Sequence, residues 1–184
     1  MRNLQKILAL VLALVMSFSL VATAGAFSDD GDIDASYGDA VKVLNGLEVF
    51  QGYSDGKFDP KGSITRAEVA AIIYRIATGD VKDTQASIYS SYGQFTDVLD
   101  GSWYAGYVNY CANAGYIKGK GNKIFDPQGQ VTGYEALAMI LRAVGYDKNN
   151  EFTGSIWQIN SASIAKERHI TDNVTSTLLG NHFT

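Results

Sequence analysis

The chain has 184 residues, of which 46% are hydrophobic and 18% charged, and this composition is typical of a folded globular protein rather than a disordered one. Its 15 Lys and Arg residues stand against 19 Asp and Glu residues, and the net charge of -4 argues against a nucleic-acid-binding protein. A single Cys cannot form an internal disulfide, and together with two His residues it cannot build a Cys/His zinc site.

The first 26 residues have the pattern of a secretory signal peptide. Two basic residues precede an apolar run over residues 7–16, and residues 24–26, Ala-Gly-Ala, fit a small-residue cleavage site. Serines interrupt the run soon after residue 16, whereas a membrane span needs about 20 mostly apolar residues. We therefore expect export, removal of residues 1–26 and a mature chain that begins at Phe27.

The most informative feature is an internal duplication at an offset of 67 residues. Phe58-Asp59-Pro60 matches Phe125-Asp126-Pro127 at this offset, and Phe27-Ser28-Asp29 matches Phe95-Thr96-Asp97 with one residue of slack. Further identities at the same offset join Gly52 to Gly119, Gly62 to Gly129, Thr65 to Thr132, Glu68 to Glu135, Ala71 to Ala138, Ile73 to Ile140 and Arg75 to Arg142. Identities that recur in one order at one offset indicate a repeat architecture.

Each copy is predicted to open with an amphipathic helix, because apolar residues recur at i, i+3, i+4 and i+7. The predicted stripes are Ala40, Val43, Leu44 and Leu47 in copy one, and Tyr107, Tyr110, Cys111 and Ala114 in copy two. No cationic residue flanks Cys111, so we interpret it as a small core residue rather than a reactive thiol.

A glycine-rich turn and a second helix complete each copy. The turns cover residues 52–60 and 119–127, and we expect the Phe of each Phe-Asp-Pro to fill the space between the two helices. Thr65-Arg66-Ala67-Glu68 and Thr132-Gly133-Tyr134-Glu135 fit the capping box that starts a helix. The predicted buried stripes are Val69, Ile72, Ile73 and Ile76 in copy one, and Ala136, Met139, Ile140 and Ala143 in copy two.

These elements predict a mainly α fold of tandem helix-turn-helix repeats, two complete and a third partial. Gly79 and Gly145 stand where helix C-caps belong, and an apolar pattern around Trp157 starts a further helix. The predicted segments are a signal peptide (1–26), a first repeat (27–79), a linker (80–94), a second repeat (95–146) and a partial third repeat or truncated C-terminal segment (147–184). A two-helix unit cannot bury its apolar face alone, so we expect the copies to pack on each other.

These motifs resemble the S-layer homology repeat. That repeat runs as F-x-D, a Trp-Tyr-containing helix, a G-x-x-D-G-x-F-x-P turn and then T-R-A-E at the second helix. The matching segments are Phe27-Ser28-Asp29, residues 52–60 and Thr65-Arg66-Ala67-Glu68 in copy one, and Phe95-Thr96-Asp97, Trp103-Tyr104, Phe125-Asp126-Pro127 and Thr132-Gly133-Tyr134-Glu135 in copy two. The chain departs from the pattern at Gly133, which replaces the Arg, and at Ser36-Tyr37, which replaces the Trp-Tyr pair.

The resemblance implies non-covalent attachment of an exported bacterial protein to the cell envelope. Its expected partner is cell-wall carbohydrate, commonly a pyruvylated secondary wall polymer, and it implies neither a cofactor nor catalysis. The ligand-binding residues that it implies are Arg66, Trp103, Tyr104, Gly52, Asp55, Gly56, Gly119, Lys120 and Gly121. Because copy two has Gly133 in place of the Arg, the two copies are expected to bind unequally.

Structural roles for the same residues stay open at this point. Arg66 also fits a solvated surface residue, and Trp103 and Tyr104 also fit a core. The acidic run over residues 30–34 resembles the start of a calcium loop, but alanine and valine stand where such a loop needs glycine and glutamate. We therefore predict an acidic turn there and no metal.

Two other functions stay open as well. One is a structural S-layer or envelope protein that self-assembles through its repeats. The other is the anchor part of a wall hydrolase whose catalytic domain is absent from this chain. The sequence contains no G-x-S-x-G, H-E-x-x-H or P-loop motif, which favours a protein that is not an enzyme.

N-terminal sequencing of the exported protein tests the expected cleavage between Ala26 and Phe27. Because the small-residue site ends at Ala26, the sequence read should begin with Phe27-Ser28-Asp29. Recovery of a chain that retains residues 7–16 would contradict both the cleavage site and export by this route.

Overall fold

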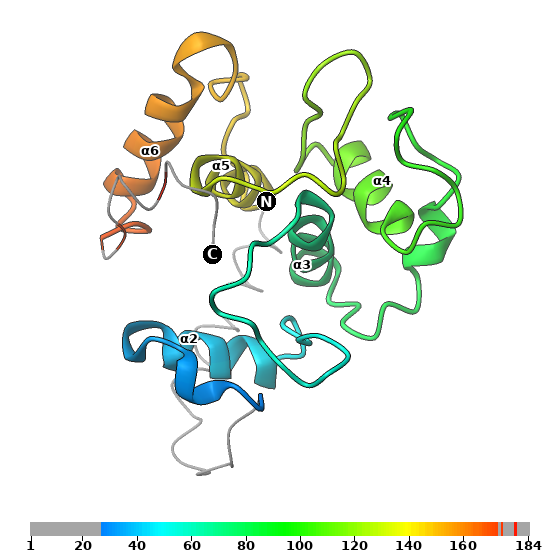
Figure 1. The fold of residues 1–184 in the computed structure, drawn as a ribbon. Coiled ribbons are helices and arrows are strands. Elements are labelled where there is room, and N and C mark those ends of the chain that lie inside the picture. Colours follow the sequence, from blue (N-terminus) through cyan, green and yellow to red (C-terminus); the bar gives the residue numbers. More distant parts are fainter. Residues whose placement is uncertain (1–26, 173, 175–178, 180–184) are drawn as a thin grey trace. The chain divides into compact units, whose positions relative to one another are not determined.

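The computed structural model describes residues 27–172, 174 and 179, so the predicted signal peptide lies outside the described residues (Figure 1). The described residues form two compact units, a first unit up to Pro60 and a second unit from Lys61 onward. The α-helices of the described residues are α2 (Ala35–Gly46), α3 (Arg66–Thr78), α4 (Ala105–Asn113), α5 (Gly133–Ala143) and α6 (Trp157–Glu167). Extended pairing within the described residues is limited to isolated bridges, which confirms the mainly α prediction.

Both predicted capping boxes form and set the starts of α3 and α5. The Thr65 hydroxyl accepts the Glu68 N–H at 3.3 Å while the Glu68 carboxylate accepts the Thr65 N–H at 2.7 Å. Thr132 and Glu135 repeat the arrangement at 3.3 and 2.9 Å. Each box satisfies backbone donors that a helix start would otherwise leave without partners.

The two helices end at the predicted glycines. Gly79 caps α3 in the left-handed conformation. At the end of α5, Gly145 has a φ of 96° and donates to Arg142 O, while the Tyr146 N–H donates to Leu141 O. This pair of hydrogen bonds is a Schellman motif, in which glycine follows the cap residue.

The first-copy helix α2 buries a different stripe from the one predicted. Its start is set by Asp34, whose carboxylate accepts the Ser36 N–H at 2.8 Å. Val41 is its buried residue, whereas Ala40 and Val43 are exposed, so the predicted stripe is wrong. The apolar residues of this short helix can form more than one apolar face, and their spacing alone does not decide which face is buried.

A carboxylate in each copy explains the Phe-x-Asp motif. Asp29 accepts the N–H groups of Phe58 and Asp59, both at 2.8 Å. Asp97 accepts the equivalent N–H groups, from Phe125 at 2.9 Å and Asp126 at 2.7 Å. The motif therefore holds the Phe-Asp-Pro turn, and the hydrogen bonds from Phe58 and then Asp59 lower the pKa of Asp29 although partial desolvation opposes them.

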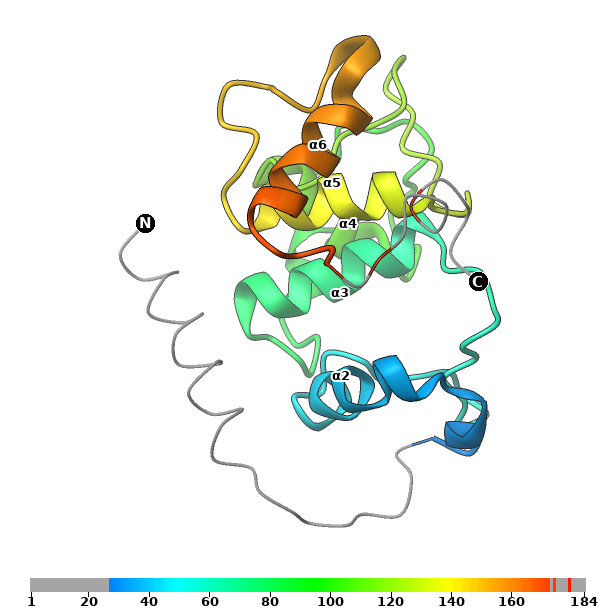
Figure 2. The same cartoon turned by 90° about the vertical axis from the view of Figure 1, so that its left-hand side faces the viewer.

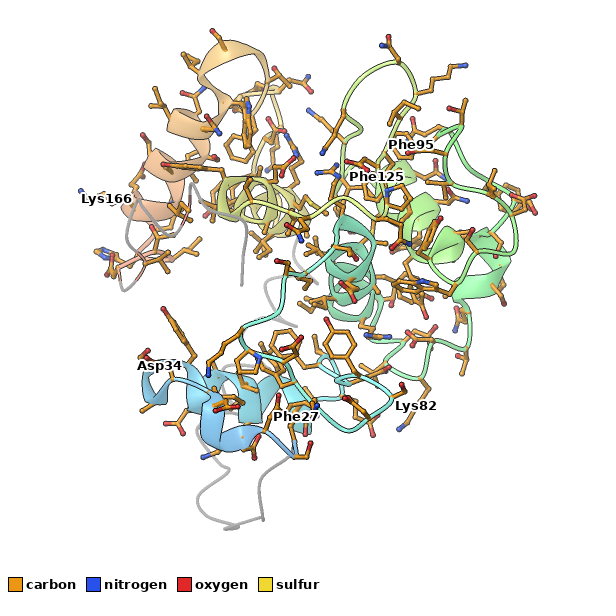
Figure 3. The ribbon with its side chains drawn as sticks, in the orientation of Figure 1. Phe27, Asp34, Lys82, Phe95, Phe125 and Lys166 are labelled. Carbon is orange, nitrogen blue, oxygen red and sulfur yellow. The ribbon has the colours of Figure 1, made fainter. Side chains whose placement is uncertain are left out.

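In the second unit, α3 from the first copy packs against α4 and α5 from the second (Figure 1). Phe125 is 0% exposed in this core, and its ring lies 5.4 Å from that of Phe95 (Figure 3). Cys111 is also fully buried, and burial raises the pKa of its thiol to about 12, which confirms it as a core residue. The expected packing of the copies on each other is therefore confirmed within this unit.

Helix α5 is buried on two sides. Ala136 and Met139 join the core shared with α3 and α4, while Leu137 and Leu141 join a second cluster with α6 (Figure 2). The predicted single stripe is therefore only partly correct, and Ile140 is 45% exposed. In α3, Val69 and Ile73 are buried as predicted, whereas Ile76 in the last turn is 50% exposed.

The segment predicted as a linker, residues 80–94, is part of the second unit and is held there by hydrogen bonds and an ion pair. Asp80 accepts the Tyr74 hydroxyl at 2.8 Å, and Asp83 forms an ion pair with Arg75 at 2.7 Å. Further along, the Asn109 side chain of α4 donates to the carbonyls of Tyr89 and Ser90 at 3.0 and 2.7 Å. Two of its carboxylates and two of its backbone carbonyls therefore hold this segment in place.

The caps and the core make separable contributions to stability. Thr65→Ala and Thr132→Ala should each lower the free energy of unfolding by about 1 kcal/mol, because each removes a capping hydrogen bond. Ile73→Ala should cost about 2–5 kcal/mol, since Ile73 is 2% exposed. Urea denaturation measures all three, and Ile140→Ala is the control because it stands at the equivalent repeat position but is 45% exposed. Equal losses for Ile73→Ala and Ile140→Ala would contradict this core.

Candidate functional site

Arg66 is the first residue of α3, and its side chain is only 4% exposed. Its Nε donates to Phe125 O at 2.8 Å, and a terminal nitrogen donates to Lys118 O at 3.0 Å. The other terminal nitrogen pairs with Glu135 Oε1 at 3.2 Å. The guanidinium also lies 4.7 Å from the centre of the Phe125 ring, so Arg66 ties α3 to the second turn and to α5.

The backbone reinforces this junction. The Arg66 and Ala67 N–H groups donate to Gly129 O and Pro127 O at 2.9 and 3.0 Å. Burial lowers the pKa of the Arg66 guanidinium, and the carboxylate of Glu135 opposes that shift. The interpretation of Arg66 as a solvated surface residue is therefore wrong, and most of its donors already have partners within the chain.

The second glycine turn approaches this arginine through its backbone. The Lys120 N–H donates to Ile124 O at 2.8 Å, which closes the turn. A Cβ atom at Gly119 would come within 2.5 Å of Ile124 O and 2.6 Å of the Phe95 ring, so only glycine fits there. The Lys120 ammonium extends outward and pairs with Asp126 at 2.8 Å.

A buried carboxylate fixes two further cations. The Asp147 side chain is 1% exposed and accepts from Arg142 Nε at 2.6 Å and from Lys118 Nζ at 3.2 Å. It also accepts the Phe152 N–H at 2.7 Å. Burial alone would raise the pKa of Asp147, but the hydrogen bonds from Phe152, Arg142 and Lys118 lower it, so the carboxylate is ionised at neutral pH.

These groups surround a groove of about 420 Å³. Its cationic lining residues are Arg66, Lys118, Lys120 and Arg142. The other lining groups that bear on binding are the Glu135 carboxylate, the Trp157 ring at the start of α6, and the backbone of Gly119, Gly121 and Gly154. These four cations pair with three carboxylates, Glu135, Asp126 and Asp147, so one positive charge remains in excess and favours an anionic ligand. The partly buried indole of Trp157 offers a flat apolar face beside them.

The structure brings together four of the residues that the resemblance implied. Arg66, Gly119, Lys120 and Gly121 all line the groove. Trp103 and Tyr104 lie elsewhere, at the N-terminal end of α4, where their rings form an edge-to-face pair 5.4 Å apart. Trp103 is 57% exposed and is not among the residues that line the groove.

The remaining implied residues belong to the first unit. Asp55 lies in the turn that contains Gly52 and Gly56, and it lines a separate open cavity of about 430 Å³. Asp55 and Lys57 form an ion pair at 3.4 Å, with both side chains more than half exposed. This turn combines acidic and basic groups and lacks a buried cation of the kind seen at Arg66.

Sequence reasoning did not assign Arg142, Asp147 or Trp157 to the site. The sequence contained one indication that Arg142 is important, because Arg142 matches Arg75 at the offset of 67 residues. Trp157 carried a weaker signal, since a Phe-Thr pair precedes it as one precedes Trp103, although the spacing differs. The tryptophan that lines the groove is therefore Trp157, at the start of α6, and not Trp103.

Two further properties concern the described part of the chain. Among residues 27–172, 174 and 179, no group of three His, Cys, Asp or Glu side chains is arranged to hold a metal ion, and the acidic run at residues 30–34 forms a short 3-10 turn. None of the helices in this same part has both the length and the apolar character to cross a membrane.

Comparison with known proteins agrees with the repeat assignment. The S-layer homology domain matches residues 26–70 and 94–137. The middle cell wall protein of Brevibacillus brevis is 33% identical over 92% of this chain, and the surface layer protein of Brevibacillus choshinensis is 33% identical over 91%. The chain spans 16% and 15% of the length of these two relatives.

A further relative is similar to a shorter part of this chain. The cellulosome-anchoring protein of Acetivibrio thermocellus is 34% identical over 57% of this chain, which corresponds to 23% of the relative. No solved structure matches the chain significantly.

Removal of the Arg66 side chain should destabilise the second unit. Arg66→Ala leaves the carbonyls of Phe125 and Lys118 without this donor and Glu135 without its ion-pair partner, so we expect a loss of about 3 kcal/mol in the free energy of unfolding. Arg66→Lys should recover only part of this loss, because one ammonium cannot reach all three acceptors.

Chemical denaturation of both variants checks this expectation. Lys166→Ala is the control, since Lys166 lies exposed on α6 (Figure 3) and surface substitutions change stability by about 0.5 kcal/mol or less. An Arg66→Ala protein as stable as the Lys166→Ala control would contradict the structural role of Arg66.

Proposed function

The chain belongs to the S-layer homology domain family, and we propose that it holds an exported bacterial protein at the cell envelope by binding cell-wall carbohydrate non-covalently. The single observation that carries the proposal is the cationic groove between the second turn, α5 and the start of α6. Relatives that are named cell wall, surface layer and anchoring proteins support the same role.

The charge of the groove favours an acidic wall polymer. Lys120 is 42% exposed and its partner Asp126 is equally exposed, so a ligand carboxylate can replace Asp126 at little cost. Arg66 is held by Glu135 and Arg142 by the buried Asp147, which keeps their charge at the groove without loss of side-chain entropy on binding. A sugar bearing a carboxylate, such as a pyruvate ketal, suits this arrangement.

Trp157 supplies the apolar part of the proposed site. Its ring packs against the cluster formed by α5 and α6 and also lines the groove. A ring held in this way can stack on the face of a sugar while the cations contact its acidic substituent. We assign no catalytic residue, and the relatives named as surface and anchoring proteins favour a non-enzymatic role.

Self-assembly within an envelope layer is the second candidate. One relative is named a surface layer protein, and exposed apolar side chains stand at Ile140 on α5, at Ile156 just before α6 and at Ile159 on α6. Such side chains suit contact between copies of the chain. This candidate requires association of the protein in the absence of wall polymer, which sedimentation measures directly.

Sedimentation with purified wall polymer tests the proposed groove. Lys120→Ala and Trp157→Ala should each weaken binding roughly tenfold, a change of about 1.4 kcal/mol in binding free energy. Trp103→Ala is the matched control, because Trp103 is an exposed tryptophan outside the groove and should bind as the parent chain does. Binding should also weaken at high salt, since the exposed cations are screened.

Thermal melts of each variant separate lost binding from lost folding. Folded Lys120→Ala and Trp157→Ala proteins that bind the polymer at full strength would reject the groove as the site. Loss of binding in Trp103→Ala alone would return the site to α4. A parent chain that fails to bind the polymer but forms large assemblies would favour the second candidate.

A further inference from the structure

The first described residue, Phe27, is firmly seated in the first unit. Its side chain is 6% exposed, and its ring lies 5.4 Å from the ring of Phe58 (Figure 3). A Cβ atom at Gly52 would come within 2.5 Å of the Phe27 ring, so the turn leaves room for this ring by using glycine. The position of the Phe27 nitrogen is therefore determined by packing.

The residues that follow Phe27 are held by hydrogen bonds. The Ser28 N–H donates to Gly56 O at 2.9 Å. The Asp29 carboxylate accepts the N–H groups of Phe58 and Asp59, both at 2.8 Å. Packing and hydrogen bonds thus anchor three consecutive residues to the first glycine turn.

Asp30 lies against the backbone nitrogen of Phe27. Its Oδ1 accepts the Phe27 N–H at 3.1 Å, and its own N–H donates back to Phe27 O at 3.2 Å. Its other oxygen, Oδ2, is buried and has no hydrogen-bond partner among the described residues. An unpaired buried carboxylate oxygen is unfavourable, and a single amide N–H cannot satisfy both oxygens.

We propose that Asp30 is the binding site for the α-ammonium group that forms when the chain is cut between Ala26 and Phe27. In that cleavage, water adds across the peptide bond, leaving a carboxylate on Ala26 and an amine on Phe27 that is mainly protonated at neutral pH. An ammonium has three N–H donors and a full positive charge, so it can bind both oxygens of Asp30. The proposal depends on cleavage after Ala26 and is independent of the carbohydrate groove.

Processing then stabilises the first unit. Before cleavage, the Phe27 nitrogen offers Asp30 one neutral donor, and after cleavage it offers an ion pair at a site already shaped for it. Other charged groups near this site are Asp32 in the same 3-10 turn, Asp29, whose carboxylate is held by two backbone amides, and Lys57, which is exposed and pairs with Asp55. None of them forms a hydrogen bond with Oδ2 of Asp30.

The ion pair has a defined pH dependence. Pairing with Asp30 should raise the pKa of the Phe27 α-amino group above its ordinary value of about 7.7–8.0. The added stability is fully present below that ordinary value and disappears as the pH rises through the raised pKa. Cleaved and uncleaved forms should therefore differ at neutral pH and converge in alkaline solution.

Nuclear magnetic resonance on the chain of residues 27–184 measures the pKa of the Phe27 α-amino group directly. We expect it to lie about half a unit or more above the ordinary value. Asp30→Asn should return it to that value, and Asp39→Asn is the control because Asp39 is an exposed carboxylate on α2 of the same unit.

A second measurement compares this chain with one that carries Gly-Ala before Phe27, which restores the amide and displaces the charge. Hydrogen exchange of the Phe58 amide should be about fivefold faster in the extended chain at neutral pH, the change expected for an interaction of about 1 kcal/mol. Asp30→Asn should abolish the difference between the two chains, and so should alkaline pH with Asp30 intact.

An ordinary α-amino pKa in the 27–184 chain, or equal exchange rates in the two chains at neutral pH, would overturn the proposal. A mature amino terminus other than Phe27 would also overturn it. If Asp30→Asn unfolds the first unit, the pH dependence of the difference between the two chains with Asp30 intact gives the same decision.

Discussion

The buried guanidinium of Arg66 is the interaction on which the second unit depends. It stands at the start of a helix from the first copy, and its partners, Lys118, Phe125 and Glu135, all belong to the second copy. A guanidinium suits this junction because its planar donors reach several acceptors at once while its face stacks on Phe125. Removing the guanidinium would leave its acceptors without a donor. The packing of the first-copy helix α3 on the second copy therefore depends on this arginine.

The same residue connects the fold to the proposed site. Arg66 lines the groove with its remaining surface, while Lys118 and Arg142 are held at the groove by the buried carboxylate of Asp147. Pairing with carboxylates within the chain lets several cations lie close together without unfolding the unit by repulsion. An acidic ligand would meet a charged surface that is already ordered.

The two copies share the same local hydrogen bonds but differ in the charged groups around their turns. In both, the Asp of Phe-x-Asp holds two amides of the Phe-Asp-Pro turn, and a Thr-x-x-Glu box starts the next helix. The second turn contacts a buried arginine, whereas the described structure of the first turn carries only exposed charges. Repetition of sequence therefore preserves the turn without repeating the groove.

The sequence by itself determined the duplication, which is a pattern of identities. It also determined the α class, both capping boxes and the glycine helix ends, because these depend on hydrogen bonds between residues a few positions apart. Only the tertiary structure decided that Arg66 is buried, that α5 packs on two sides, and that Trp157 rather than Trp103 lines the groove. Those outcomes depend on contacts between residues more than 50 positions apart for Arg66, and on the order in which helices pack. Local spacing carries no information about which of two similar side chains a distant helix will cover.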